Sequence, residues 1–328
     1  MNFTDFQQLR EQILRERKGV RDCAATNLYR ALARLIPPAA PPAERAVHRC
    51  HLAEAWVKLF GLPPETARRA LVSCGVRHSL ALLFQHYATE DAQLWLPEDN
   101  YPVYGELARA AGLEPRTFPT LPEPHWPDAN AGTAHELLVV TNPIKPLGRW
   151  LNSKDVITLT SWLAASPQRR LLLDTVYTFE AQFHDSTLKL LSTGQTLLLH
   201  SLTKGWLSPR LFGVALVPEN DAVALTSLFR EQPPSQANLT LAREYLSRHA
   251  GMPVTVAREL ASARQRLFEV VPNGLLSGAR LDAPGYFLTV AGRWSDLLQT
   301  TNLLGLPASV FGSPQEHITV LSSLKFIP

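Results

Sequence analysis

Hydrophobic positions along the chain follow two patterns, helical spacing in long stretches and short continuous runs. At the amino terminus, Phe3, Phe6 and Ile13 fall on one face of an expected amphipathic helix. Thr4 or Asp5 is available as its cap. The apolar stripe of such a helix docks on the protein's own core or, as the alternative, on a partner subunit.

From Ala46 onward, short apolar runs alternate with longer helical patterns. The expected strands are Gln93–Leu96, Glu114–Phe118, Leu137–Thr141, Arg170–Asp174, Thr196–His200 and Phe212–Val217. The expected helices between them are Arg77–Tyr87, Val103–Ala111, Ser153–Ala165 and Asp221–Arg230. This alternation is typical of βαβ units, so it predicts an α/β fold with a three-layer α/β/α large domain and a mostly parallel sheet.

The carboxyl-terminal part of the chain has a different character. Two long helical patterns come first, and strand, helix and strand patterns follow: Ser235–His249, Pro253–Val271, Gly285–Ala291, Ser295–Leu304 and His317–Leu321. Near the other end, four prolines in Ile36–Ala43 predict an irregular connector. We therefore expect an N-terminal helix with a proline-rich arm (1–45), a large domain (46–250), and a linking helix with a small α+β domain (251–328).

Composition narrows the classes of partner. The 328 residues include 32 Lys+Arg and 29 Asp+Glu, a net charge of +3 that does not favour nucleic acid or a membrane as partner. Cys23, Cys50 and Cys74 are too few and too scattered for a disulfide framework or a metal site. Acidic residues interrupt the first 17 positions, and the chain has no apolar run of about 18 residues. We expect a cytoplasmic protein.

Two ionisable residues stand at the ends of successive apolar strands. Asp174 ends the run that begins at Arg170, and Lys204 follows the run that ends at His200. Ligands bind at the carboxyl edge of an open parallel sheet, where burial would disfavour the charged form of an amine and leave it a candidate nucleophile. Alone, Asp174 could cap the next helix and Lys204 could be a solvated surface group. Together they favour a reactive site.

A glycine precedes the helix that begins near Arg77. Free backbone N–H groups at a helix amino terminus form an anion site suited to a phosphate, although most such glycines only make a turn. Gly75 is therefore a candidate phosphate contact.

Taken in order, five motifs resemble the class I/II aminotransferases, the fold type I enzymes that depend on pyridoxal 5'-phosphate. The motifs are Cys74–Arg77, Glu98–Tyr104, Thr141–Arg149, Asp174–Tyr177 and Ser201–Lys204. The resemblance extends from about Ala46 to the carboxyl terminus, which makes the large domain the cofactor-binding one. An ordered set of this kind is specific for fold and cofactor, and much less specific for the reaction.

The resemblance implies a role for each matching residue. Lys204 would form the internal aldimine with the cofactor and later shuttle a proton. Asp174 would pair with the pyridinium nitrogen, so that the ring can act as an electron sink. Tyr177 would hydrogen-bond the phenolic oxygen of the ring, and Tyr101 would stack on the ring face.

The remaining implied contacts concern the phosphate. Gly75, Val76 and Arg77 would hold it at the helix terminus, and Ser201 would donate a hydrogen bond from below. Two plainer interpretations stay open: Tyr101 could be a core aromatic, and Ser201 an ordinary turn serine.

Two departures from the family pattern lie in the expected cofactor site. Lys145 occupies the position of the asparagine that contacts the ring oxygen, so it either pairs with the phenolate or points elsewhere. Asn142, at the first asparagine of the same loop, is expected to shape the loop beside the cofactor. Arg210 follows Lys204 by six residues instead of eight, and it is still the best available phosphate cation.

A third departure concerns the substrate. The family's C-terminal arginine, which grips the substrate α-carboxylate, has no counterpart in Glu316–Ser323. Another residue takes its place, or the substrate is not an ordinary α-amino acid. His317 is a weak replacement candidate, and Arg280 and Arg293 are expected to be surface charges.

These features predict an aminotransferase that moves an amino group between an amino compound and a keto acid through Lys204, as a biosynthetic homodimer acting on a small amino substrate. The first alternative is a lyase, decarboxylase or cyclase of specialised metabolism that uses the same cofactor. The second is a non-catalytic binding protein or regulator. Asp174 and Lys204 argue against that second alternative, since a passive fold would need neither group.

Overall fold

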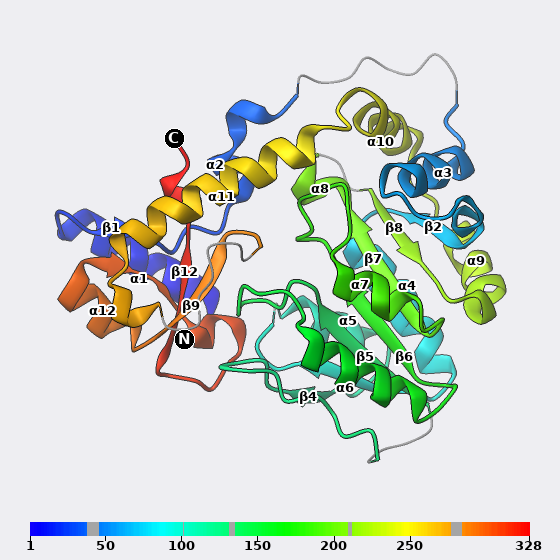
Figure 1. The fold of residues 1–328 in the computed structure, drawn as a ribbon, viewed down its shortest axis with the longest axis horizontal. Coiled ribbons are helices and arrows are strands. Elements are labelled where there is room, and N and C mark those ends of the chain that lie inside the picture. Colours follow the sequence, from blue (N-terminus) through cyan, green and yellow to red (C-terminus); the bar gives the residue numbers. More distant parts are fainter. Residues whose placement is uncertain (38–45, 101, 131–134, 209–211, 277–283) are drawn as a thin grey trace.

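The computed structural model describes residues 1–37, 46–100, 102–130, 135–208, 212–276 and 284–328. Its main feature is a seven-stranded sheet in the order β2-β8-β7-β6-β5-β3-β4 (Figure 1). The strands are β2 (Ala70–Ser73), β3 (Gln93–Pro97), β4 (Arg116–Phe118), β5 (Glu136–Thr141), β6 (Arg170–Asp174), β7 (Thr196–Ser201) and β8 (Gly213–Leu216). Only β8 runs antiparallel to its neighbours, β2 and β7. The predicted mostly parallel sheet is confirmed, and β2 is a strand that the sequence patterns did not reveal.

Helices cover both faces of this sheet, because successive side chains on each strand point to opposite sides. On β6, Leu172 packs with α4, α5 and α9 on one face, whereas Leu171 and Leu173 pack with α6 and α7 on the other. Near β2 and β8, the second face is covered by α3 and α10. These helices are α3 (Arg49–Leu59), α4 (Val76–Thr89), α5 (Val103–Ala110), α6 (Ser153–Ala164), α7 (Asp185–Leu191), α9 (Ala222–Glu231) and α10 (Gln236–Arg248). The three-layer α/β/α architecture is confirmed.

A smaller antiparallel sheet lies beyond the long helix α11 (Met252–Val270). Its order is β11-β12-β9, formed by β9 (Phe287–Ala291), β11 (Leu306–Pro307) and β12 (Ile318–Ser322). The helix α12 (Trp294–Thr301) follows β9 and ends at Asn302, whose left-handed backbone (φ 58°) stops it. The predicted helix Ser295–Leu304 was therefore too long, and its last two residues form the short strand β10 (Leu303–Leu304).

The amino-terminal segment joins this carboxyl-terminal part. The strand β1 (Arg21–Asp22) pairs in parallel with β10, and Phe6 of α1 (Phe3–Glu16) is buried in one cluster with Val320. Figure 1 shows the amino-terminal elements α1 and β1, in blue, among the carboxyl-terminal elements α12, β9 and β12, in orange and red. Helix α1 thus packs on the protein's own core. Its cap is Asn2, whose side chain accepts from the N–H of Asp5, so the predicted caps Thr4 and Asp5 were wrong.

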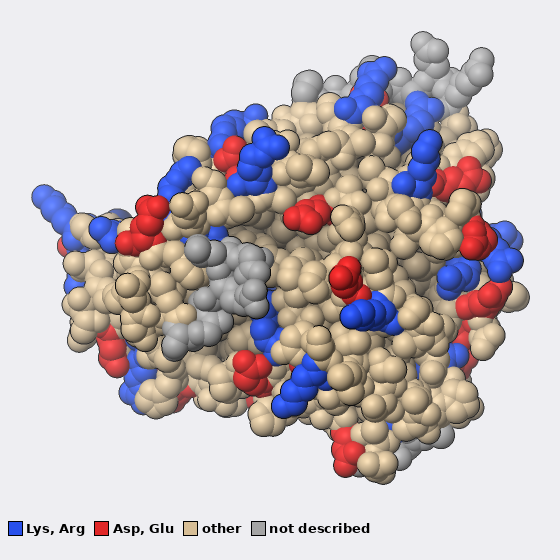
Figure 2. All heavy atoms as spheres, viewed as in Figure 1, with Lys and Arg blue, Asp and Glu red and all other residues tan. Residues whose placement is uncertain are grey.

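Short elements complete the described chain. They are α2 (Leu28–Ala31), α8 (Leu202–Gly205) and the 3-10 helices Ala33–Leu35, Pro64–Arg69, Glu219–Asp221, Asn273–Leu275, Ala308–Phe311 and Leu324–Phe326. Most of the expected proline-rich connector lies outside the described residues, and the division at 45 and 250 stays a prediction. No helix in the described ranges combines the length and apolar composition of a membrane span. Charges of both signs are interspersed on the face shown in Figure 2.

Candidate active site

The candidate residues meet at the carboxyl edge of the large sheet. β5, β6 and β7 are parallel neighbours that end at Thr141, Asp174 and Ser201. Register pairs Thr141 with Asp174 and Asp174 with Leu199, so the segments that follow all leave from the same edge. This arrangement brings together the loop with Lys145, the loop with Tyr177 and the helix α8 with Lys204.

Asp174 is a buried acid held by two hydrogen bonds. The residue is only 3% exposed. Oδ1 accepts from the N–H of Val176 at 2.9 Å, and Oδ2 accepts from the hydroxyl of Tyr104. Burial and the neighbouring Asp174 raise the pKa of Tyr104 well above its usual value, so the phenol stays a donor. The carboxylate is fixed, with further lone pairs on each oxygen for a ligand.

Tyr177 lies between two amines. Nζ of Lys145 is 3.6 Å from the centre of its ring, and Nζ of Lys204 is 5.5 Å away. Burial raises the pKa of Tyr177, but Lys204 and Lys145 outweigh burial, and the net pKa is lowered. The hydroxyl of Tyr286 lies 3.0 Å from that of Tyr177 and assists this shift.

Lys145 points toward the other candidate residues and lies over the ring of Tyr177. Its backbone N–H donates to Oγ1 of Thr141 at 3.0 Å, which ties the loop to the end of β5. Burial lowers the pKa of Lys145, while Tyr177 and Asp174 oppose that effect. The edge therefore carries two amines around one phenol.

The expected phosphate end lies where β2 meets α4. Gly75 precedes the helix with φ 103°, a left-handed backbone that favours glycine, and no side chain caps the helix. A Cβ on Gly213 of β8 would lie 2.7 Å from Cα of Gly75, so the two backbones touch. Val76 begins α4, and Arg77 is exposed. Backbone N–H groups without a side-chain cap form a ready anion site.

Two predicted cofactor contacts are bonded to the protein itself. Oγ of Ser201 accepts from the N–H of Thr203 at 3.1 Å and donates to the carbonyl of Phe212 at 2.9 Å, so it caps the helix that carries Lys204. Asn142 accepts from the N–H of Leu151 at 3.0 Å and donates to two hydroxyls of α7, which shapes its loop.

The remaining residues singled out in the sequence are either outside the described residues or exposed. Tyr101, Arg210 and Arg280 lie outside the described residues. His317 is exposed beside β12, and Arg293 forms an exposed ion pair at 3.1 Å with Glu316.

Tyr104 and Tyr286 were missed as site residues. Tyr104 carried a signal, since it ends the Glu98–Tyr104 motif and lies in the first turn of the helix expected at Val103–Ala111, which follows an expected strand end. Tyr286 carried none, because 109 positions separate it from its partner Tyr177.

A cavity of about 490 Å³ opens beside Tyr177, between the loop after β6 and α11. Its walls include the stacked rings of Trp150 and His184, with centres 4.7 Å apart, and the carboxylates of Glu180 and Asp185. A small molecule that reaches Tyr177 has room here for an uncharged or cationic extension.

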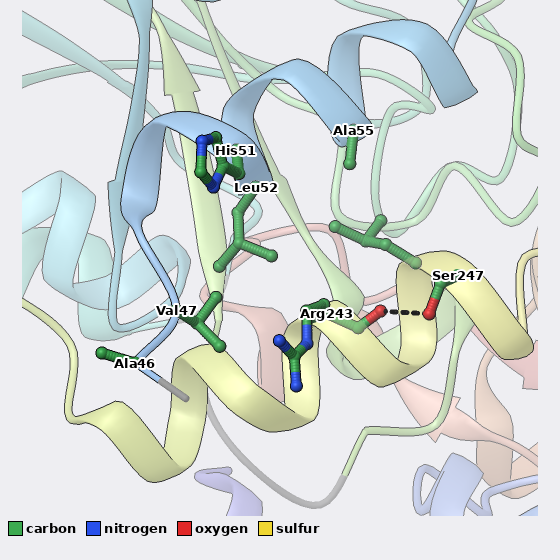
Figure 3. A pocket seen from close by; sticks show the side chains of 8 residues that line it. Ala46, Val47, His51, Leu52, Ala55, Arg243 and Ser247 are labelled. Atoms are coloured by element: carbon green, nitrogen blue, oxygen red, sulfur yellow. Dashed lines mark hydrogen bonds between the residues drawn. The ribbon is translucent and has the colours of Figure 1, made fainter. Parts of the chain in front are cut away.

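A smaller pocket of about 140 Å³ lies between α3 and α10 (Figure 3). Apolar side chains line it together with His51 and Arg243, and the hydroxyl of Ser247 donates to the carbonyl of Arg243 at 2.8 Å. No candidate residue of the sheet edge lines this pocket, so we assign it no part in the chemistry.

The fold and the edge geometry define an α/β enzyme with an acid, a phenol and amines at adjacent strand ends. The family model for aminotransferase class I and II matches residues 46–267. The chain therefore belongs to this family of fold type I pyridoxal-phosphate-dependent enzymes and is an aminotransferase-like enzyme.

Individual relatives are more distant. The chain is 28% identical over 154 residues to the S-alkyl-thiohydroximate lyase SUR1 of Arabidopsis thaliana, which covers 44% of this chain and 33% of the relative. It is 27% identical over 148 residues to the probable aminotransferase TAT1 of the same plant, covering 42% and 32%. The matches thus span about a third of the length of these curated relatives.

Solved structures agree in fold. An aspartate aminotransferase mutant of Thermus thermophilus superposes with a TM-score of 0.69 at 19% identity, covering 98% of this chain and 91% of that one. The L,L-diaminopimelate aminotransferase of Chlamydomonas reinhardtii gives 0.70 at 14% identity, covering 99% and 93%. At this identity the likeness concerns the fold alone.

Proposed function

We propose that this chain is a pyridoxal-phosphate-dependent aminotransferase that transfers an amino group between an amino compound and a keto acid. The observation that carries the proposal is the meeting of Asp174, Tyr177 and Lys204 at the ends of adjacent parallel strands. An acid, a phenol and an amine in one place are the groups that bind a charged pyridine ring with an aldehyde.

The residues fit this cofactor. Asp174 would hold the ring nitrogen with its remaining lone pairs, and Tyr177 would donate to the phenolic oxygen. The backbone N–H groups after Gly75 would hold the phosphate, because α4 has no side-chain cap. Glycine at 213 lets β8 lie against the backbone of Gly75 without a clash. When bound, the ring supplies a sink for the negative charge that develops on the substrate carbon.

The chain's own residues would then orient groups and move protons. Tyr104 holds one oxygen of Asp174, so the carboxylate would meet the ring nitrogen in a single orientation. Nζ of Lys204 would take the proton from the substrate α-carbon and then deliver it to the cofactor. Ser201 holds α8, and with it this amine, at the sheet edge.

Replacement of Lys204 tests the proposal. We expect the purified protein to develop the visible absorbance of lysine-bound cofactor when pyridoxal phosphate is added, and Lys204→Ala to lose it. Loss of the proton-transfer group should lower kcat by at least about 10²–10⁴-fold. Lys189→Ala, on the exposed side of α7, is the matched control. Full activity of Lys204→Ala, or a wild type without the absorbance, contradicts the proposal.

A lyase, decarboxylase or cyclase that uses the same cofactor is the second candidate. The strand β12 without an arginine favours it, and one matched relative is named a lyase. The two candidates differ in what an amino donor leaves behind when no keto acid is present. Accumulation of the aminated cofactor supports transamination, whereas release of product with unchanged cofactor supports the second candidate.

The family also supports a homodimer with two sites near the interface, acting in biosynthesis in the cytoplasm on a small amino substrate. We retain these as proposals. Sedimentation of the purified chain should give twice the monomer mass of 36.4 kDa at micromolar concentration. A monomer under those conditions removes the dimer from the proposal.

A further inference from the structure

Lys145 is an amine at the sheet edge that lies over a phenol ring and forms no ion pair with an acid that the structure describes. Its Nζ rests on the face of Tyr177 at 3.6 Å, and it forms no ion pair within 4 Å among the residues that the structure describes. A phenol face is a weak counterpart for an ammonium group, since a cation–π contact contributes about 0.5–2 kcal/mol. An amine in this state can accept an anionic ligand.

The loop of Lys145 also touches the small sheet. A Cβ on Gly148 would lie 2.3 Å from the carbonyl oxygen of Phe287, so this loop lies directly against the start of β9. Phe287 pairs with Ser322 at the end of β12. Tyr286, the residue before β9, meets the hydroxyl of Tyr177. Lys145 therefore lies at the junction of the two sheets. An arginine on β12 would have to extend to this same junction to bind the substrate.

Other cations around this junction are engaged. Arg264 of α11 donates to backbone carbonyls just before β9 at 2.7 and 2.8 Å. Arg293 pairs with an exposed glutamate, and Arg149 pairs with two carboxylates at 2.6 and 2.8 Å. Lys204 already has a role in the proposed function, where it binds the cofactor and transfers a proton. Among the described cations of this region, Lys145 is the one left to bind an anion from the substrate.

We propose that Lys145 anchors a carboxylate of the substrate, in place of the arginine that β12 lacks. The substrate would then carry a carboxylate close to the reacting amine, and this inference rests on the proposed function. An ammonium group offers three donors as a point charge, whereas a guanidinium holds a carboxylate with two parallel bonds. The anchor is thus looser than an arginine clamp, and it comes from the large domain's loop.

Binding of a carboxylate that cannot react gives the first test, without turnover. We would measure, by calorimetry on the cofactor-loaded protein, the affinities of 3-phenylpropionate and of the matched neutral alcohol 3-phenylpropan-1-ol. Loss of one charge-assisted hydrogen bond corresponds to about a ten- to hundredfold loss of affinity. Lys145→Met should lose the preference for the carboxylate by that factor, and Lys145→Arg should keep most of it.

The control is Lys154→Met, which removes an exposed lysine of α6 and should change neither affinity. A second measurement uses the cofactor absorbance to compare amino acids with the amines left when their carboxylate is removed: L-alanine with ethylamine, L-phenylalanine with 2-phenylethylamine, and L-lysine with cadaverine. The wild type should bind the amino acid more tightly in at least one pair, and Lys145→Met should reduce that preference.

Several outcomes overturn the proposal. One is an unchanged carboxylate preference in Lys145→Met; another is a wild type that favours the amine in every pair. A variant that shifts only the pH midpoint of the cofactor absorbance would assign Lys145 to the phenolic oxygen of the cofactor instead. Failure of the proposed function is distinguishable, because the wild type would then either show no lysine-bound cofactor or release product from an amino donor with the cofactor unchanged.

Discussion

The carboxyl edge of the seven-stranded sheet and the three-stranded sheet face each other across the candidate site but differ in chemistry. At this edge Asp174 and Lys204 both lie close enough to Tyr177 to act on its pKa, and Nζ of Lys204 is 5.5 Å from the centre of its ring. Beside the three-stranded sheet, the hydroxyl of Tyr286 contacts that of Tyr177. The hydroxyl of Thr319 on β12 instead donates to a backbone carbonyl of the same sheet region at 2.7 Å. The difference supports a division within the proposed function, in which the large sheet would carry the reaction and the small one would orient the site.

The strongest test of this contrast is the charge of Asp174. Asp174→Asn keeps the shape of the side chain and the acceptor for Tyr104 but removes the negative charge. By analogy with the loss of one oriented electrostatic contact, we expect kcat to fall about 10²–10³-fold. Steady-state kinetics at saturating cofactor would measure it.

A matched substitution near the three-stranded sheet gives the reference value of kcat. Asp296→Asn changes an exposed acid of α12, and its kcat should stay near that of the wild type. Equal losses in the two variants would contradict the division of labour between the sheets.

The next effect concerns the phosphate end of the same edge. Gly213→Ala would drive a Cβ to 2.7 Å from Cα of Gly75, and backbone on both sides leaves little room to relax. Overpacking of this kind costs about 1–3 kcal/mol of unfolding free energy, and we also expect weaker cofactor binding. Urea unfolding and a cofactor titration would measure both.

Gly251→Ala is the control for that substitution. A Cβ at Gly251 meets nothing within 4 Å, and its φ of −80° suits any residue. Its unfolding free energy should change by no more than about 0.5 kcal/mol. If Gly213→Ala binds the cofactor as tightly as the wild type, the close contact of the two glycines is not needed for phosphate binding.

The sequence was informative where function follows from position on a regular element. Asp174 and Lys204 end or follow continuous apolar runs, and parallel strands carry their carboxyl ends to one edge. The fold class and the meeting of these residues were therefore predictable. β2 was not predicted, because it is only four residues long and the polar and apolar residues on either side of it obscure the strand pattern.

Contacts across distant parts of the chain were not predictable. The direction of Lys145 depends on a loop that Gly148 presses against β9, and Tyr286 reaches Tyr177 only because the two sheets meet. Neither fact follows from periodicity, which reports on one element at a time. Tyr104 is intermediate, since its place in a motif was visible and its partner was not.

The apolar layer beneath the edge gives a prediction of pH dependence. His200 of β7 is buried, which lowers its pKa from 6.5 to about 3, and Nδ1 accepts from Nε1–H of Trp56 at 3.1 Å. Between these two values the unfolded chain binds a proton that the folded protein does not. The unfolding free energy should therefore fall as the pH falls through this window, by about 1.4 kcal/mol per pH unit from His200.

His200→Gln tests this sign, because glutamine can accept the same hydrogen bond without titrating. We expect a flatter dependence of unfolding free energy on pH between about 6.5 and 4. The exposed His317→Gln should leave the slope unchanged. An unchanged slope in His200→Gln would mean that water or charge reaches the layer under the reactive edge.

The smallest effect on kcat is expected from a substitution beside the three-stranded sheet. Tyr286→Phe removes the hydroxyl that helps to lower the pKa of Tyr177, so that pKa should rise, as ultraviolet difference titration can record. The loss of one hydrogen bond costs about 0.5–1.5 kcal/mol, and kcat should fall only a few-fold, because both lysines still flank Tyr177. A loss as large as that of Asp174→Asn would instead make the small sheet a full participant in the chemistry.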